Sequence, residues 1–600
     1  MPELVFKGKE FVYNHHLSVP FRPLVANADK GIGDASLDDN LIIHGDNLHA
    51  LKALLPMYAG KVDCIFIDPP YNTGNEGWSY NDNVNSPMLR EWLNSNPITI
   101  EDGLRHDKWA AMMYPRLKLL HELLNDEGSL WMTISDHEGH RARLLLDEIF
   151  GEDSFVASVV WQKRTSPEAR VALGAAHDYV LVYSKRPGSA RFAKLRLTEE
   201  QASAFSNPDN DPRGEWTSTD MTAQGYRKNQ MYEIVTPAGS RYTPPPGRCW
   251  SLIEPEFNRL RSEGRIWFGV NGDARPRLKT YLDESEGVSA WTWWPNTEVG
   301  DNQEAKKEAM RILGAERNFD YPKPVSLVSR VLELASRSDS LVLDSFAGSG
   351  TTGHAVLAAN AKDGGDRKFI LVEMEGYADD LTAERVRRVI NGYSFTGTQR
   401  DELLREKITW TKFQQASRLL EQVEGLENAY GPSYDTIRKS VTNGELVVTG
   451  EKKVEEKAEG LGGTFTYCTL GDPIDMDRLL TGESLPSFEA LASVLFHTAT
   501  NTPLSTETME TDALGQPGHG YLGEAAGVHV WLIYQPDLEF LKSTDAALTL
   551  AKARSIAETR EGRHVVFAPA RFVSQKMLND ADLPVEFAPL PFALYRVERE

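Results

Sequence analysis

The stretch LIIHGDNLHALKALLPMYAGKVDCIFIDPPY, residues 41–71, decides the fold of this chain. Residues 41–48 and 62–71 each begin as a β-branched apolar run and end in turn residues, which is typical of a buried strand that opens into a loop. The residues between them have apolar side chains at helical spacing. Strand, helix and strand in this order predict a βαβ unit, and therefore an α/β fold with a parallel sheet.

The same alternation recurs on both sides of a region with a different character. Residues 106–128 predict a helix that stops at Gly128, and strand 129–136, helix 137–151 and strand 155–163 follow. The pattern returns with helix 325–338, strand 340–350, helix 351–361 and strand 368–375. Residues 187–300 instead have short segments, a proline cluster at 243–248 and many aromatics and arginines. Two α/β blocks therefore bracket an inserted module.

The length of the chain exceeds what one hydrophobic core can organise. We predict a first α/β part at 1–186, the insertion at 187–300, a second α/β part at 301–395, and a helical linker with a mixed α+β C-terminal domain at 396–600. Within the last segment, residues 451–460 predict a charged linker or helix. Residues 74–106 are polar and lack any period, so they predict a loop beside a site.

Composition excludes several classes of protein. No apolar run reaches the ~18 residues that cross a bilayer, and the N-terminus lacks the layout of a signal peptide, so we expect a cytoplasmic protein without a membrane partner. The three cysteines lie far apart, which predicts neither a disulfide framework nor a metal site. The net charge of -22 opposes nucleic-acid binding by the chain as a whole, but residues 151–300 are close to neutral and leave room for a local basic face.

The first motif with chemical content is Asp68-Pro69-Pro70-Tyr71, where a buried strand opens into a loop. The exocyclic amine of a nucleobase is a poor nucleophile because its lone pair is delocalised into the ring. The Asp68 carboxylate and the Pro69 carbonyl could both accept its protons and hold the nitrogen toward a tetrahedral geometry. Pro70 stiffens the turn, and Tyr71 offers a flat face to an extruded base. The alternative for Asp68 alone is an ordinary turn carboxylate.

The second motif, LDSFAGSGTT at residues 343–352, is a strand followed by a glycine turn and a helix. Glycines let a ligand approach the backbone, and the helix N-terminus attracts an anion. A dinucleotide or a phosphate could use the same device, although the absence of GKT or GKS excludes a P-loop. Glu373 ends the next predicted strand, where an acidic side chain binds ribose hydroxyls. We therefore predict a nucleoside-containing cofactor, with S-adenosylmethionine as the candidate.

Together, DPPY and FAGSG resemble the amino-methyltransferases that act on DNA, and their order resembles the permuted β class of that family. LIIHGDNLHALKALL, IDPPYNTG, WAAMMYPRLKLL, FDYPKPVSLVSRVL and LDSFAGSGTTGHAVLAAN resemble the modification (Mod) subunit of type III restriction-modification systems over residues 40–395. The resemblance implies a doubly wound, Rossmann-like methyltransferase sheet with a target recognition domain in the insertion. It also implies a homodimer and a helicase-nuclease partner subunit.

The resemblance also implies roles for individual residues. Asp68, Pro69, Pro70 and Tyr71 would hold the target base. The cofactor would be bound by Asp344, Phe346, Gly348, Gly350, Thr351 and Glu373, with Asp46 near its adenine and Lys323 in the motif that precedes the glycine strand. Asp46 could equally be a helix N-cap, and Lys323 a solvated loop cation.

Basic residues near and within the insertion are candidate contacts to DNA. Arginine and lysine neutralise phosphates or pair with guanine, so such a surface could hold and read a duplex. The candidates are Lys163, Arg164, Arg227, Lys228, Arg241 and Arg248. For any one of these cations, an ordinary solvated position remains the alternative.

The function predicted from the sequence is sequence-specific methylation of adenine N6 in double-stranded DNA, without a metal. The resemblance associates DPPY with adenine N6 in preference to cytosine N4. Cytosine N4 remains an alternative, because both targets are amidine-like amines that ask the same of the site. The chain could also serve mainly as the DNA-recognition module of a restriction assembly, or act on an amine in RNA or on a protein amide.

Overall fold

The structure is a computed structural model that describes residues 3–73, 103–166, 172–285, 287–314, 316–317, 319–442, 444–474, 485–500, 502, 504–505, 508–525 and 527–590. It divides into two compact units, one of residues 193–291 and one formed by the chain on both sides of them. Most of the predicted loop 74–106, residues 74–102, lies outside the described residues. Every described helix is too short or too polar to cross a membrane.

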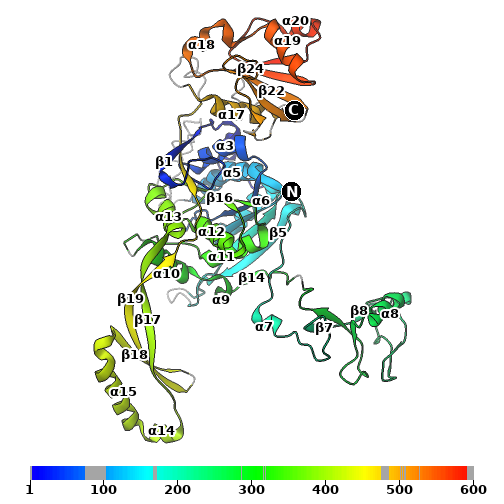
Figure 1. The fold of residues 1–600 in the computed structure, drawn as a ribbon, viewed down its shortest axis with the longest axis vertical. Coiled ribbons are helices and arrows are strands. Elements are labelled where there is room, and N and C mark those ends of the chain that lie inside the picture. Colours follow the sequence, from blue (N-terminus) through cyan, green and yellow to red (C-terminus); the bar gives the residue numbers. More distant parts are fainter. Residues whose placement is uncertain are drawn as a thin grey trace. The chain divides into compact units, whose positions relative to one another are not determined.

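The larger unit is built on a ten-stranded sheet with the order β1-β20-β2-β16-β15-β3-β4-β6-β5-β14 (Figure 1). The six neighbours from β20 to β4 are parallel, and β1 and β6 run antiparallel to the strands beside them. In sheet order, the bounds are β1 Leu24–Ile32, β20 Phe465–Leu470, β2 Leu41–His44, β16 Lys368–Glu373, β15 Leu341–Asp344, β3 Val62–Ile67, β4 Leu124–Ile134, β6 His177–Ser184, β5 Phe155–Gln162 and β14 Trp293–Trp294.

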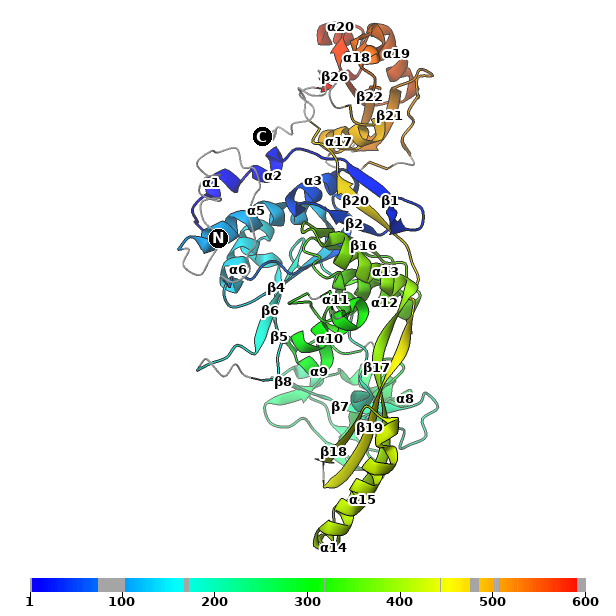
Figure 2. The ribbon, with the colours of Figure 1, turned by 90° about the vertical axis from the view of Figure 1, so that its left-hand side faces the viewer.

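Helices cover both faces of this sheet (Figure 2). Ile370 and Val372 of β16 share a core with α3 and α5, whereas Phe369 and Leu371 of the same strand contact Gly353 of α12. Full burial of an aliphatic side chain contributes about 1.5–3 kcal/mol, so packing on both faces stabilises the parallel strands. The covering helices are α3 Asn47–Tyr58, α5 Arg105–Leu123, α6 Gly139–Phe150, α11 Val325–Ala335, α12 Thr351–Asp363 and α13 Glu384–Asn391.

The strand order reverses between β3 and β15, which lie side by side with Cys64 opposite Val342. From β3 the chain continues to β4 on one side, and from β15 it continues to β16 on the other. Ligands of open α/β sheets bind beyond the carboxyl ends of the strands at such a switch point. The loops that follow β3 and β15 therefore begin at the same place on the same edge.

Four details of the sequence prediction were wrong. The helix predicted to reach Gly128 ends at Leu123, because Leu124 turns to extended backbone and pairs with Val62 of β3. The boundary at 395 falls inside β17 (Gly392–Lys407), and the predicted linker 451–460 lies largely in β19 (Glu445–Glu459), because these two long strands form one antiparallel ladder. β20 lies in the predicted C-terminal segment, yet it joins the central sheet beside β2.

The chain after β16 forms two further substructures. The first is the three-stranded sheet β17-β19-β18, with β18 at Thr436–Thr442 and helices α14 Trp410–Gln414 and α15 Ala416–Tyr430. The second is the sheet β21-β22-β24-β26, which carries an apolar core on each face. Its elements are α17 Phe488–Thr500, β21 His519–Ala525, β22 Val528–Ile533, α18 Leu538–Lys542, α19 Leu550–Thr559, β24 Arg563–Ala568, α20 Gln575–Asp580 and β26 Val585–Pro589.

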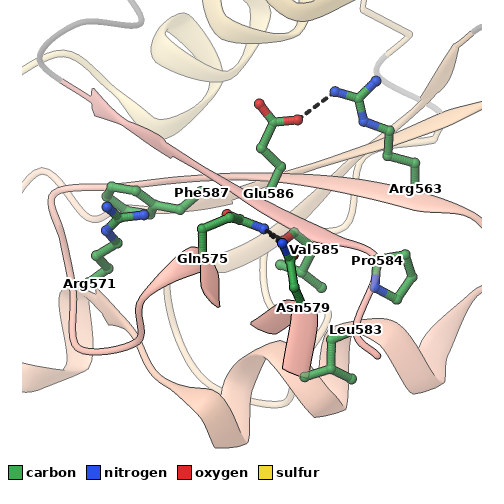
Figure 3. Close-up of a pocket in the computed structure, with 9 residues that line it drawn as sticks. All are labelled: Arg563, Arg571, Gln575, Asn579, Leu583, Pro584, Val585, Glu586 and Phe587. Carbon is green, nitrogen blue, oxygen red and sulfur yellow. Dashed lines mark hydrogen bonds and ion pairs between the residues drawn. The ribbon is translucent and has the colours of Figure 1, made fainter. Parts of the chain in front are cut away.

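A pocket of about 510 Å³ lies beside β26, where Glu586 pairs with Arg563 at 2.5 Å (Figure 3). Its other lining residues are Arg571, Gln575, Asn579, Leu583, Pro584, Val585 and Phe587. None of the residues predicted for the functional site lines this pocket.

The smaller unit consists of short strands and one longer helix around a compact apolar core that includes Trp250 and Phe257. Its main elements are α7 Glu199–Ala202, β7 Trp216–Asp220, β8 Thr222–Gln224, β11 Arg248–Trp250, α8 Glu254–Ser262, β12 Ile266–Trp267 and β13 Arg277–Tyr281. The larger unit adds α1 Lys9–Val12, α2 His15–Ser18, α9 Asn296–Val299 and α10 Asn302–Leu313.

Candidate active site

Asp68 follows β3 directly, and both oxygens of its carboxylate have partners. Thr133 Oγ1, from the end of neighbouring β4, donates to Oδ1 at 2.5 Å. The Lys323 ammonium pairs with Oδ2. The Asp68 side chain is 24% exposed and that of Lys323 is 9% exposed, so the carboxylate is partly accessible while the ammonium is nearly buried.

The turn after Asp68 is held from two sides. Trp109 of α5 donates its indole N–H to the Pro70 carbonyl at 2.7 Å. The Pro69 carbonyl comes one residue earlier in the chain, closer to the end of β3. Asn72 has a φ of 58°, a left-handed conformation that Asn tolerates better than most residues. Its amide donates to the fully buried Glu138 at 2.5 Å. The Pro-Pro-Tyr segment is therefore fixed before any substrate arrives.

Tyr71 lies beside the Asp68 carboxylate and packs partly against the main core. Burial raises the pKa of its phenol well above the usual value, and the Asp68 charge adds to this effect. The ring therefore stays neutral at working pH. Lys323 Nζ lies over the ring, 5.1 Å from its centroid.

The glycine turn after β15 leaves no space for side chains at two positions. Gly348 and Gly350 have φ values of 50° and 76°. A Cβ at Gly350 would lie 2.8 Å from the Thr382 carbonyl oxygen, and one at Gly348 would lie 3.1 Å from the Phe319 ring. The two glycines therefore let the backbone form a narrow turn at the sheet edge.

The Asp344 side chain holds this turn by two hydrogen bonds. Its Oδ1 accepts the Phe346 N–H at 3.0 Å, and its Oδ2 accepts the Thr352 hydroxyl at 2.6 Å. Burial raises the pKa of this carboxyl to about 7. Since both oxygens are engaged by the loop itself, the geometry gives Asp344 the role of shaping the turn.

Glu373, at the end of β16, also hydrogen-bonds to the turn, and it lies at the strand end where an acidic side chain binds the ribose of a nucleoside cofactor. Its oxygens accept the N–H groups of Gly348 at 2.7 Å and Glu375 at 2.9 Å. Nearby, the rings of Phe319 and Tyr377 meet edge to face at 5.8 Å, with Phe319 against Gly348. A buried carboxylate for ribose hydroxyls beside an aromatic wall and a glycine turn fits an adenosine-containing cofactor.

Lys323 connects the two strand ends. Its ammonium binds Asp68, and its backbone carbonyl accepts the Thr351 hydroxyl at 3.2 Å. The fully buried Arg385 donates to Ser349 Oγ at 3.0 Å and Thr351 Oγ1 at 2.9 Å, which fixes the start of α12. The Thr351 hydroxyl, predicted to bind cofactor, thus faces Lys323 and Arg385.

Two more of the predicted residues have internal partners. Asp46 is the N-cap of α3, accepts the Leu48 N–H at 2.8 Å, and lies 3.4 Å from an Arg116 nitrogen. Lys163 binds the buried Asp178 at 2.6 Å. That ion pair lies at the same sheet edge as Asp68, because β5 ends and β6 begins there.

The predicted DNA contacts differ in how strongly they are engaged. Arg241 pairs with Glu233 at 2.5 Å, and Arg248 donates to Thr222 Oγ1 at 2.7 Å. Arg227 donates to the Gln230 side chain at 3.2 Å, and Arg227 and Lys228 lie in the stretch 224–229, whose residues are all exposed and none of which is acidic. Arg164 is exposed in the larger unit.

Sequence reasoning missed four residues of this site: Thr133, Trp109, Asp178 and Arg385. Thr133 could have been found, because it ends a predicted buried strand that should lie next to the strand of Asp68. Trp109, Asp178 and Arg385 carried no such signal, since their roles depend on tertiary neighbours.

The charge of Glu373 should make cofactor binding depend on pH. Burial raises the pKa of this carboxyl to about 7, and only the ionised form accepts two ribose hydroxyls without giving up an oxygen to its own proton. Below pH 7 the site must first lose this proton, so we expect S-adenosylmethionine to bind about tenfold more weakly at pH 6 than at pH 8. Titration calorimetry at both values measures the ratio.

Two variants assign this dependence to one carboxyl. Glu373→Gln should bind more weakly and remove the pH dependence, whereas Asp344→Asn should retain it. The opposite assignment in the two variants would contradict the role given to Glu373.

The fold and site together define an α/β protein with a strand-end carboxylate that is joined through Lys323 to a glycine-rich turn. The model of the family described as DNA methylase matches residues 62–384, and the chain belongs to this family.

Three relatives show where the likeness lies. The StyLTI Mod subunit of a type III restriction-modification enzyme from Salmonella typhimurium is 34% identical over 62% of this chain and 56% of its own length. The EcoPI Mod subunit of Escherichia phage P1 is 29% identical over 62% of this chain and 61% of its length. The type II methyltransferase M.KpnI of Klebsiella pneumoniae is 30% identical over 57% of this chain and 82% of its length. The likeness thus covers less than two thirds of the two Mod subunits.

Proposed function

We propose that this chain transfers the methyl group of S-adenosylmethionine to the N6 amine of adenine in DNA, as the modification subunit of a restriction-modification system. One observation carries the proposal: Lys323 binds Asp68 through its ammonium and Thr351 through its carbonyl, so the DPPY turn and the glycine turn form one site. Membership of the DNA methylase family and the names of the relatives support it.

The protein's own residues would prepare the amine. The Asp68 carboxylate and the Pro69 carbonyl would accept the two amine protons, which would direct the nitrogen lone pair away from them. Tyr71 supports the flat face of the base. S-adenosylmethionine supplies an electrophilic methyl carbon. As the N–C bond forms, the sulfur leaves with the electrons of its bond to that carbon, and the amine gives one proton to Asp68 or water.

Under this proposal, the motif order is that of the permuted β class, and the inserted unit 193–291 is the target recognition domain. Its net charge is close to neutral, in contrast to the strongly acidic chain, which suits contact with phosphates. We also propose that the chain pairs with a second copy of itself and with a restriction subunit, and that it works in the cytoplasm.

Base-resolved methylation sequencing of a host that lacks related enzymes, expressing this chain, tests the function. We expect N6-methyladenine within one short recognition sequence. Methyl groups on cytosine N4, or a genome without new methylation while the purified chain still binds the cofactor, would each contradict the proposal.

The exposed stretch 224–229 is the best candidate for DNA contact in the smaller unit. Replacement of Arg227 and Lys228 by Ala should weaken binding of a duplex that carries the recognition sequence at least about tenfold. It should also lower the slope of log affinity against log salt by about 2. Arg259→Ala is the matched control, because Glu256 and Glu263 already pair with that guanidinium. Equal binding by the double variant and the control, measured by fluorescence anisotropy across salt concentrations, would place the DNA elsewhere.

A further inference from the structure

The position beside the Asp68 carboxylate that the proposed function assigns to the target amine is occupied by a side-chain nitrogen. Lys323 Nζ is bound to Asp68 Oδ2 and lies over the Tyr71 ring. These are the two groups that would receive the base, the carboxylate for its amine and the ring for its flat face. The ammonium thus makes the two contacts that the proposed function assigns to the substrate base.

The base and the ammonium compete for the same volume. Stacked aromatic rings have centroids about 4.5–7 Å apart. Lys323 Nζ lies within that range, 5.1 Å from the Tyr71 centroid. A base that stacks on the same face of this ring with its amine on Asp68 must therefore displace the ammonium.

Lys323 is built to move only at its tip. Its backbone is fixed to α12 by the hydrogen bond from Thr351, while four methylenes separate the ammonium from that anchor. A second carboxylate lies at the same sheet edge, because Asp178 stands at the start of β6, beside the end of β4 that carries Thr133.

We propose that Lys323 is a resident plug of the active site, which binds Asp68 until the target amine displaces its ammonium toward Asp178. The inference rests on the proposed function and adds a positioning residue to it. It also explains why Lys323 is nearly buried although it lies in a loop before α11. The plug keeps Asp68 in place and adds an energetic step that a base must overcome to enter.

The test compares Lys323→Met with wild type on a duplex that carries 2-aminopurine at the methylated position found by sequencing. The fluorescence lifetime component of 2-aminopurine stacked in the duplex reports the fraction of bases still inside the helix. We expect Lys323→Met to lower that fraction at least threefold at equal occupancy, and to lower KM for unmodified DNA at least threefold. Lys323→Arg, which keeps a cation at Asp68, should leave a larger stacked fraction than Lys323→Met does, and Lys362→Met, an exposed lysine at the end of α12, is the control that should match wild type.

A purely structural role for Lys323 gives another result. The Met variant would then lose kcat with unchanged or raised KM, and the stacked fraction would not fall; that outcome overturns the plug. Lys323→Gln, which removes the charge and can hold Asp68 only by a neutral hydrogen bond, replaces the Met variant if thermal unfolding shows that Lys323→Met does not fold, and it should lower the stacked fraction and KM in the same direction but by less. A wild-type chain without methylation activity would refute the proposed function, whereas active wild type with unchanged base extrusion in the variants refutes the plug alone.

Discussion

Asp68→Ala should lower methyl transfer by about 10³-fold or more while S-adenosylmethionine binds with nearly unchanged affinity. Asp68 is the carboxylate at the carboxyl end of β3 that can accept an amine proton, and loss of one oriented polar group at a reacting atom costs about 10²–10³ in rate. The loss should be larger here, because the Ala variant also leaves the nearly buried Lys323 ammonium without its ion-pair partner.

Transfer of a radiolabelled methyl group to duplex DNA measures the first quantity, and titration calorimetry the second. Asp366→Ala, at an exposed carboxylate before β16, should behave as wild type in both assays. Methylation of DNA by the Asp68→Ala variant at a rate near that of wild type would refute the assignment of the active site.

Arg385→Met should destabilise the larger unit by about 3 kcal/mol. The Arg385 guanidinium is fully buried, donates to Ser349 and Thr351, and lies 3.6 Å from Glu308. Loss of one partner of a buried ion pair costs about 3–5 kcal/mol, and we expect the lower end because Glu308 is one-third exposed. Cofactor affinity should fall as well, since the start of α12 loses its support.

Urea unfolding followed by tryptophan fluorescence measures this difference. Arg388→Met on the same helix is the matched control, because the half-buried pair between Arg388 and Glu384 should contribute less than about 1 kcal/mol. Equal effects of the two substitutions would show that Arg385 has no special role at the glycine turn.

The parts of the fold that follow from local pattern were predictable. The run 62–67 before Asp68 is apolar at nearly every position, because β3 is covered on both faces, and this produces a strong strand signal. The glycine turn was equally visible in the sequence, as two closely spaced glycines after a strand. Their cause lies in the structure, where Gly348 and Gly350 occupy positions at which a Cβ would collide with neighbours. That the two motifs lie close together followed from the rule that ligand loops gather at the carboxyl ends of parallel strands.

What escaped prediction depends on contacts between distant residues. Lys323 was assigned to the cofactor side, but its ammonium binds Asp68, 255 positions away in the chain. The arginine that secures the glycine turn lies on a helix whose sequence resembles an ordinary amphipathic surface. The charged residues of β19 suggested a linker because their strand lies in a sheet with little buried surface, where hydrophobic alternation is weak.

The position of β20 determines how this protein can be divided for expression. A polypeptide that stops near residue 395 would contain every residue of the proposed active site but would lack Phe465–Leu470, the strand that covers the backbone of β2. The buried Tyr467 and Cys468 would be missing, and the unpaired N–H and C=O groups of β2 would invite pairing between molecules. A minimal soluble fragment would therefore have to replace residues 396–464 with a short turn and retain β20.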